Sequence, residues 1–247
     1  MCSVLTGRAG RRLLGAVALV FLVTACAEVT ALIGPVPGLG GLPGVTGSAP
    51  AAPAAPAEFA IPPGAVRYRT YLMQAWQYHF AMAEDPAIGF GQVHQESRFD
   101  CSAVSSGGSV GCAQFRPATA AEVNQWIPAQ VRATCPVLSG CPLDPKWALT
   151  AMVEYDFHLW SGVSKVATPR ERWGFTLSAY NGGGAVTGAE RAACARSRDC
   201  DPARYFHNVE RYCGSFGRSD ASCRENREYP HVILDTWAPG YHRWLQG

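Results

Sequence analysis

The residues of this chain whose types and spacing suit catalysis lie between Glu96 and Gln114. Glu96 ends a largely apolar stretch, a loop rich in serine and glycine follows, and the amide of Gln114 closes it. A carboxylic acid held on a rigid element, beside a wall of backbone, suits a general acid next to a cleft. Such an acid needs poorly solvated surroundings that raise its pKa. Val93, Phe99 and Phe115 are its apolar neighbours along the chain.

Helices are the elements expected to hold this acid. Asp85-Pro86 is typical of an N-cap and a first-turn proline, and it predicts a helix through Ile88 and Val93 to Glu96. Apolar spacing and similar starts predict six more helices, over residues 66–83, 117 to about 126, 145–159, 169–180, 202–212 and 229–245. No run alternates as strand residues do. Residues 65–247 are therefore expected to form one all-α domain, with minimal β structure at most.

Three segments resemble conserved motifs of one enzyme family. Ala179–Gly183 resembles its Ala-Tyr-Asn-Ala-Gly motif, and Glu225–Tyr229 resembles its Glu-Thr-x-x-Tyr motif. The longest motif matches without a gap at Glu96, Ser97, Phe99, Ala103, Ser105, Gly108, Gly111, Gln114, Pro117, Ala118 and Thr119. The family that these segments resemble is the soluble lytic transglycosylase domain of glycoside hydrolase family 23, and the resemblance covers about residues 80 to 235.

The resemblance implies a lysozyme-like fold and cleavage of the β-1,4 bond between N-acetylmuramic acid and N-acetylglucosamine in peptidoglycan, with no metal or cofactor. Most glycosidases use two carboxyl groups, whereas this family uses one. The substrate's N-acetyl oxygen stabilises the oxocarbenium-like centre, and the muramic C6 hydroxyl attacks in place of water. Glu96 would protonate the leaving oxygen and then take the hydroxyl proton, which leaves a 1,6-anhydromuramic end.

The same resemblance implies roles for four substrate-binding residues. Ser105 would hydrogen-bond the reacting sugar or a water, although a serine also suits a turn here. Gln114 would fix an acetamido or hydroxyl group. Tyr180 and Asn181 would orient the N-acetyl group or the acid; the alternative is a buried tyrosine and a helix C-cap.

Other polar and aromatic residues near these motifs are assigned mainly to structure. Ser97 is expected to bond local backbone, and His94 lies on a different helix face from Glu96. Glu225 and Tyr229 are also assigned to structure, or to contacts behind the reacting groups. The tryptophans are assigned mostly to the core.

The chain departs from the family at several positions around Gln114. Cys112, Ala113 and Arg116 stand where the family usually places apolar residues, and Cys101 stands where it often has proline. A cation at Arg116 could meet the lactyl carboxylate or the peptide-stem acids of the substrate. The departures concern substrate preference rather than the basic chemistry.

The N-terminus has the layout of an export signal. Three arginines precede an apolar stretch over residues 13–25, which is too short to span a bilayer as a mature helix. The residues before Cys26 resemble a bacterial lipobox, which implies a signal peptide over 1–25 and diacylation of Cys26. A plain cleaved signal with a chance cysteine is the alternative. Ala27 resembles the sorting position of outer-membrane lipoproteins, so a periplasmic, lipid-anchored location is expected.

Residues 26–64 form the predicted anchor and linker. From Ala27 onward they are rich in proline, glycine and alanine with almost no charge, so they cannot bury a core of their own. Such a segment would hold the domain some tens of Å from the membrane.

Cysteine usage also favours export. Cys2 belongs to the predicted signal and Cys26 to the anchor, which leaves an even number for disulfides. Eight cysteines allow on the order of 100 pairings; metal binding is a weaker interpretation because no Cys-x-x-Cys occurs. Clustering, with elimination for the first pair, predicts Cys101–Cys112, Cys135–Cys141, Cys194–Cys200 and Cys213–Cys223.

Charge gives no indication of a nucleic-acid partner. The formal net charge is +2, and Arg8, Arg11 and Arg12 in the predicted signal account for more than this excess. No block of like charge remains. The expected partners are peptidoglycan strands and, through Cys26, a membrane. Specialised transglycosylases also accompany envelope machines, so a protein of such machinery is a further partner class.

Two alternative functions stay open. A lysozyme-type muramidase on the same fold would use water as the acceptor and a second carboxylate, for which Asp100 and Asp156 are nominal candidates. A non-catalytic, peptidoglycan-binding lipoprotein would keep the fold without the activity, and the intact Glu96 argues against it.

Overall fold

The structure, a computed structural model, describes residues 59–214 and 216–247. The predicted signal peptide, Cys26 and the linker up to residue 58 lie outside this range. Within the described residues the chain is all-helical, as predicted, and contains no β-strand. The α-helices are α1 (Pro63–Phe80), α2 (Ala87–Ser97), α3 (Pro117–Val123), α4 (Ala129–Arg132), α5 (Pro145–Gly162), α6 (Pro169–Gly182), α7 (Gly184–Cys194), α8 (Asp220–His231) and α9 (Ala238–Gln246).

Local capping explains several of the predicted helix starts. The Asp144 side chain accepts a hydrogen bond from the Trp147 N–H at 2.7 Å, and the Thr168 hydroxyl accepts one from the Glu171 N–H at 3.2 Å. Each cap precedes a proline in the first turn, whose missing N–H costs nothing at that position. The two prolines therefore start α5 and α6 where the sequence predicted.

The helix predicted over residues 202–212 is wrong. Only a single 3-10 turn, η2 (Val209–Tyr212), forms there. The Glu171 carboxylate accepts the backbone N–H groups of Tyr205 and Phe206, at 2.6 and 3.0 Å. A side chain from another helix thus replaces the helical acceptors of these groups.

Two helices, α4 and α7, lie outside the predicted elements, and another begins earlier than predicted. The helix α7 was not predicted, because no capping side chain marks its start at Gly183 and Gly184. The helix predicted from Tyr229 begins earlier, at Asp220. It passes Pro230, which lacks an N–H, and widens into a π-helical turn, η3 (Val232–Trp237), before α9 continues.

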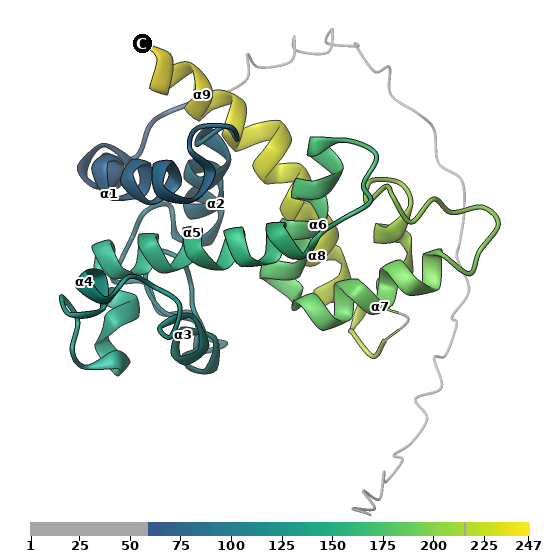
Figure 1. Cartoon of the computed structure of the whole chain (residues 1–247), viewed down its shortest axis with the longest axis horizontal. Coiled ribbons are helices and arrows are strands. Elements are labelled where there is room, and N and C mark those ends of the chain that lie inside the picture. The colour runs from purple at the N-terminus through teal and green to yellow at the C-terminus, as the bar shows by residue number, and fades with distance from the viewer. Residues whose placement is uncertain (1–58, 215) are drawn as a thin grey trace, which may run out of the picture. The chain divides into compact units, whose positions relative to one another are not determined.

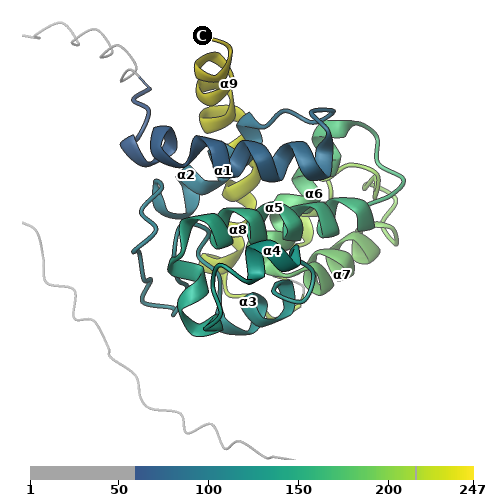
Figure 2. The same cartoon turned by 60° about the vertical axis from the view of Figure 1, so that its left-hand side comes forward.

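The helix α5 connects a first group of helices, α1 to α4 with η3 and α9, to a second group, α6 to α8. It packs on α1, α3 and α4 along its length and on α6 at its end (Figure 1). The acid-bearing helix α2 packs on η3 and α9, and α6 packs on α7 and α8 (Figure 2). One large apolar core includes Trp76, Phe90 and Trp147 of the first group and extends into the second through Trp173 and Leu177 of α6. A smaller core lies within the second and contains Phe175, Cys194, Tyr205, Phe206 and Val209.

Residues 59–62 lie against the domain ahead of α1. The Phe59 ring centroid is 5.1 Å from that of Tyr241 and 5.9 Å from that of His94. Gly240 leaves room for this ring, because a Cβ there would stand 2.5 Å from Phe59 Cδ1. These contacts place Phe59 on the core ahead of the predicted domain start at residue 65.

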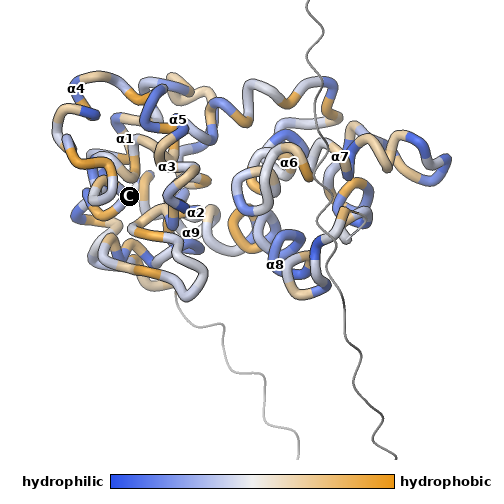
Figure 3. Tube along the Cα trace, turned by 90° about the horizontal axis from the view of Figure 1, so that it is seen from below, coloured by the Kyte–Doolittle hydropathy of each residue, from blue (hydrophilic) through white to orange (hydrophobic). Residues whose placement is uncertain are grey.

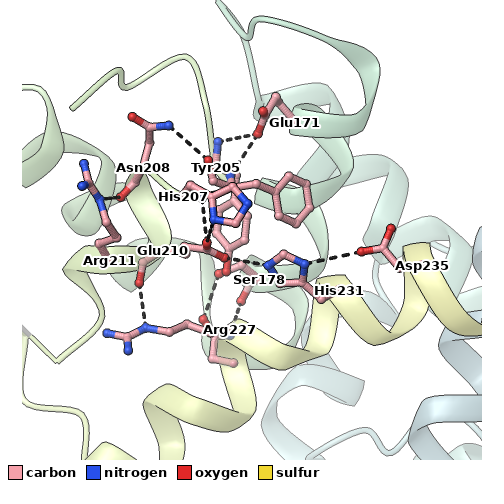
Figure 4. A network of polar contacts seen from close by, with 12 residues as sticks. Glu171, Ser178, Tyr205, His207, Asn208, Glu210, Arg211, Arg227, His231 and Asp235 are labelled. Atoms are coloured by element: carbon pink, nitrogen blue, oxygen red, sulfur yellow. Dashed lines mark hydrogen bonds and ion pairs between the residues drawn. The ribbon is translucent and has the colours of Figure 1, made fainter. Parts of the chain in front are cut away.

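A polar network fixes the segment around η2 (Figure 4). Besides the contacts of Glu171, the Glu210 carboxylate accepts the His207 N–H at 2.6 Å and lies 3.1 Å from His231 Nε2. Arg227 of α8 donates to the backbone carbonyl of Glu210 at 2.8 Å. A segment without regular structure is thus tied to both α6 and α8.

Four disulfides close local loops, and all four match the predicted pairing. They are Cys101–Cys112, Cys135–Cys141, Cys194–Cys200 and Cys213–Cys223.

In the described part of the chain, no helix is both long and apolar enough to cross a membrane. The helix α8 is mostly hydrophilic, as the blue segments beside its label show (Figure 3).

Candidate active site

A groove of about 650 Å³ lies between the two groups of helices. The end of α2, the loop over residues 98–116, α3 and α5 form one part of its lining. The junction of α6 and α7, and α8 with its preceding loop, form the rest. All five predicted catalytic and substrate-binding residues, which are Glu96, Ser105, Gln114, Tyr180 and Asn181, line this groove.

Glu96 lies in the last turn of α2 and is half-buried, with part of its side chain facing the groove. Burial raises its pKa from the ordinary value of 4.5 to about 8. A hydrogen bond from Tyr229 acts in the opposite direction, and the nearby charge of Glu225 raises the pKa further. At pH 7 a group with this pKa is protonated in about nine of ten molecules. The position therefore suits an acid.

Tyr229 is the residue whose role the sequence underestimated. Its hydroxyl donates directly to Glu96 Oε1. Glu225 lies one helical turn before Tyr229 on α8, and both line the groove. The four-residue spacing of the Glu225–Tyr229 motif is the signal that could have placed both side chains at the acid.

The loop over residues 98–116 is fixed by its backbone. It leaves α2 through two left-handed residues, Arg98 (φ 52°) and Phe99 (φ 65°). Ser97, expected to bond local backbone, donates instead to the carbonyl of Cys112 across the loop, at 2.8 Å. Gly111 has φ 80°, and a Cβ there would stand 1.6 Å from the Pro142 carbonyl oxygen. Only glycine fits this position.

Gln114 lies at the end of this loop with φ 49°. Its side-chain amide donates to the carbonyl oxygens of Gly111 at 2.9 Å and Ala103 at 3.4 Å. The Tyr180 hydroxyl donates to the neighbouring carbonyl of Ala113 at 2.8 Å. Because the side-chain N–H groups of Gln114 are bound to the loop, its side-chain oxygen is the atom left to accept a hydrogen bond from a ligand.

Asn181 belongs to a polar cluster at the end of α6. Its side-chain oxygen accepts from Asn226 at 3.0 Å, and Asn226 also donates to the Ser178 carbonyl at 2.9 Å. A Cβ on Gly182 would stand 2.0 Å from Arg218 Nη2. The bare glycine therefore lets Arg218 reach its carbonyl, at 2.5 Å.

Asp156, one of the two nominal second carboxylates, is fully buried on α5. Gln92, one turn before Glu96, donates to its Oδ1 at 3.2 Å. Burial raises the pKa of Asp156 well above its usual range, and the charge of Glu96 adds to this. The other candidate, Asp100, is exposed in a turn with Ser102 and does not line the groove.

Aromatic residues at the groove are tyrosine and phenylalanine. Phe115, Tyr155, Tyr180 and Tyr229 line it, whereas none of the tryptophans in the described residues does. His94 is structural, as predicted: its ring stacks on Trp237 at 4.0 Å between centroids. Of the apolar neighbours expected for Glu96, Phe115 shares the groove, and Val93 and Phe99 are buried in the core.

Residues 59–214 and 216–247 hold no group of three or more His, Cys, Asp or Glu side chains arranged to bind a metal ion. The chain was also compared in sequence with known proteins. No protein-family model matches it, and no curated protein matches it.

Proposed function

We propose that this chain is a peptidoglycan lytic transglycosylase that uses Glu96 as its acid and base. The observation that carries the proposal is the carboxyl group of Glu96, which has a pKa of about 8, lies in a polar groove and accepts a hydrogen bond from Tyr229. The motif resemblance gives the substrate: the bond between N-acetylmuramic acid and N-acetylglucosamine.

The chemistry proposed needs one protein acid. With Oε1 of Glu96 accepting from Tyr229, the reactive proton lies on Oε2 and passes to the leaving glycosidic oxygen as the C1–O bond breaks. The substrate's N-acetyl oxygen stabilises C1. The muramic C6 hydroxyl then bonds to C1 and returns its proton to Glu96. The glycosidic C1–O bond is thus replaced by a bond from C1 to the C6 oxygen of the same sugar. No water is consumed, and the acid is regenerated.

Burial of Glu96 supports both halves of this cycle. Because poor solvation disfavours the carboxylate, the proton is held near neutral pH and is readily retaken from the C6 hydroxyl. The negative charge of Glu225 on α8 also favours the protonated form of Glu96.

A lysozyme-type muramidase is the second candidate, and Glu225 is the observation that favours it. This carboxylate is exposed, lines the groove and is close enough to Glu96 to raise its pKa, so it could activate a water. Asp156 is poorly suited to that task because no part of it reaches solvent. A non-catalytic peptidoglycan-binding lipoprotein is the third candidate, and the raised pKa of Glu96 disfavours it.

Muropeptide analysis by mass spectrometry tests these candidates. Purified peptidoglycan digested with the wild type should release products with anhydromuramic ends, one water lighter than hydrolysis products. Glu96→Gln should release them about 10²- to 10⁴-fold more slowly. Hydrated ends that disappear in Glu225→Gln would identify the muramidase, and no release by the wild type would favour the binding protein.

The location proposed is the periplasm, with a lipid anchor at Cys26 and sorting to the outer membrane. The disulfide-rich helical domain is consistent with a place outside the cytoplasm. Metabolic labelling with a fatty acid, lost in Cys26→Ser, tests the anchor.

A further inference from the structure

Arg116 is a cation of the groove that the proposed chemistry does not use. It lies just before α3, is exposed, and lines the groove. Its side chain forms no ion pair with any other described residue. Arg218, which also lines the groove, donates to the Gly182 carbonyl at 2.5 Å and lies 3.7 Å from Glu190. Arg218 therefore has a structural role, whereas Arg116 is available to a ligand.

Hydroxyl groups stand beside this guanidinium. A Cβ placed on Gly107 would be 3.8 Å from Ser105 Oγ and 3.9 Å from Arg116 Nη2, so both groups flank the bare glycine. Ser105 Oγ accepts the Ser109 N–H at 2.9 Å, which leaves its own proton to be donated. Thr119, one turn after Arg116 on α3, also lines the groove. This wall presents hydrogen-bond donors and one positive charge.

The wall formed by α8 carries a negative charge at Glu225, and the positive charge of Arg218 in the preceding loop is engaged by the Gly182 carbonyl and Glu190. Glu225 is exposed there and lines the groove, and it makes no ion pair with Arg116. A ligand carboxylate would be repelled by Glu225 and attracted to Arg116. The charge distribution thus gives an anionic substituent one preferred wall.

We propose that Arg116, with Ser105 and Thr119, forms a subsite for a carboxylate carried on the lactyl arm of the muramic sugar. This inference rests on the proposed function, because that function supplies the substrate. In strands without stem peptides the lactyl group itself ends in a carboxylate. In strands with stems it is an amide, and the carboxylates belong to the peptide. A guanidinium can bind either the lactyl carboxylate or a carboxylate of the stem peptide with two parallel hydrogen bonds.

Binding measurements in the Glu96→Gln background test this subsite without turnover. Three glycan ligands are used: strands with stems, strands stripped of stems, and stripped strands whose lactyl carboxyl groups have been converted to neutral amides. Adding Arg116→Gln should weaken binding of a carboxylate ligand about tenfold and leave the neutral amide ligand unchanged. The ligand that loses affinity identifies the source of the carboxylate. Arg224→Gln, which removes an exposed charge outside the groove, is the matched control and should change no affinity.

The outcomes separate the two proposals. If Arg116→Gln has no effect, or weakens charged and neutral ligands equally, the carboxylate subsite is wrong. Wild-type digestion of the same strands is assayed in parallel. Digestion without a charge-specific effect overturns only the subsite, whereas a charge-specific effect without digestion overturns only the transglycosylase. Failure both to bind and to digest any strand overturns both.

Discussion

The pKa of Glu96 depends on neighbours whose effects differ in sign. Burial and the charge of Glu225 raise it, and the hydrogen bond from Tyr229 lowers it. The two side chains lie one turn apart on α8, so a single helix both raises and lowers the pKa of the acid. Their substitutions should therefore move the activity in opposite directions along the pH axis.

The first prediction concerns this pH dependence. Activity needs protonated Glu96, so wild-type kcat/KM should fall as the pH rises through about 8. Tyr229→Phe removes a bond that favours the carboxylate, so the fall should move to higher pH, with kcat lowered about tenfold. Glu225→Gln removes a negative charge, so the fall should move to lower pH. Rates on purified peptidoglycan between pH 5 and 10 measure both shifts. Shifts of the same sign would contradict the assignment.

The second prediction concerns stability. The folded-state pKa of Glu96 is raised from 4.5 to about 8. The stability linked to its proton is therefore fully present below about pH 4.5 and is lost as the pH rises toward 8. Glu96→Gln does not ionise, so relative to the wild type it should gain up to about 1.4 kcal/mol per pH unit in this window. Urea unfolding at pH 5 and 8 measures the difference. Parallel pH profiles of the two proteins would rule out the raised pKa.

At the scale of elements, the segment between α7 and α8 depends on side chains from elsewhere. It has little regular structure, and Glu171 of α6 accepts two of its backbone N–H groups. This buried carboxylate therefore stabilises a segment that would otherwise carry unsatisfied donors.

The third prediction is that Glu171→Ala destabilises the protein by about 2–4 kcal/mol, because two backbone N–H groups lose their acceptor. Glu171→Gln keeps one acceptor oxygen and should lose less. Urea unfolding gives the free energies, and hydrogen exchange at Tyr205 and Phe206 locates the effect. Equal stabilities of the wild type and both variants would count against this role.

Elements were predictable where the signal is local. Asp144 and Thr168 each stand before a proline and cap their own helices, so the starts of α5 and α6 could be read from the sequence. The segment around η2 could not, because its acceptor, Glu171, is 34 residues away from Tyr205. Of the groove, the residues of the motif from Glu96 to Gln114 could be predicted from the sequence. The contact of Tyr229 with Glu96 was not assigned, because it joins residues 133 apart.

At the scale of the whole described domain, the two groups of helices differ in how they are stabilised. The large apolar core belongs mainly to the first and takes in Trp173 and Leu177 of α6, whereas a small separate core that contains Cys194 lies within the second. Each group carries two disulfides, and Cys194–Cys200 and Cys213–Cys223, which support the smaller core, are those of the second. Disulfides are typical of units that bury too little apolar surface.

The fourth prediction follows from this difference. Under reducing conditions α7 and the segment around η2 should lose amide protection before α1, α2 and α5, since the smaller core then lacks its covalent support. Hydrogen exchange with and without dithiothreitol measures the order. Simultaneous loss of protection throughout the domain would show that the two groups unfold as one unit.

The packing of α2 has a consequence for biogenesis. The acid-bearing helix is covered by η3 and α9, and its His94 meets Tyr241, which is 147 residues further along the chain. Tyr229, whose hydroxyl donates a hydrogen bond to Glu96, also follows late, 133 residues after it. A polypeptide emerging N-terminus first cannot assemble this groove until those late residues have followed. A chain that ends before Tyr229 and Tyr241 therefore lacks both the hydrogen bond to Glu96 and part of the cover of α2.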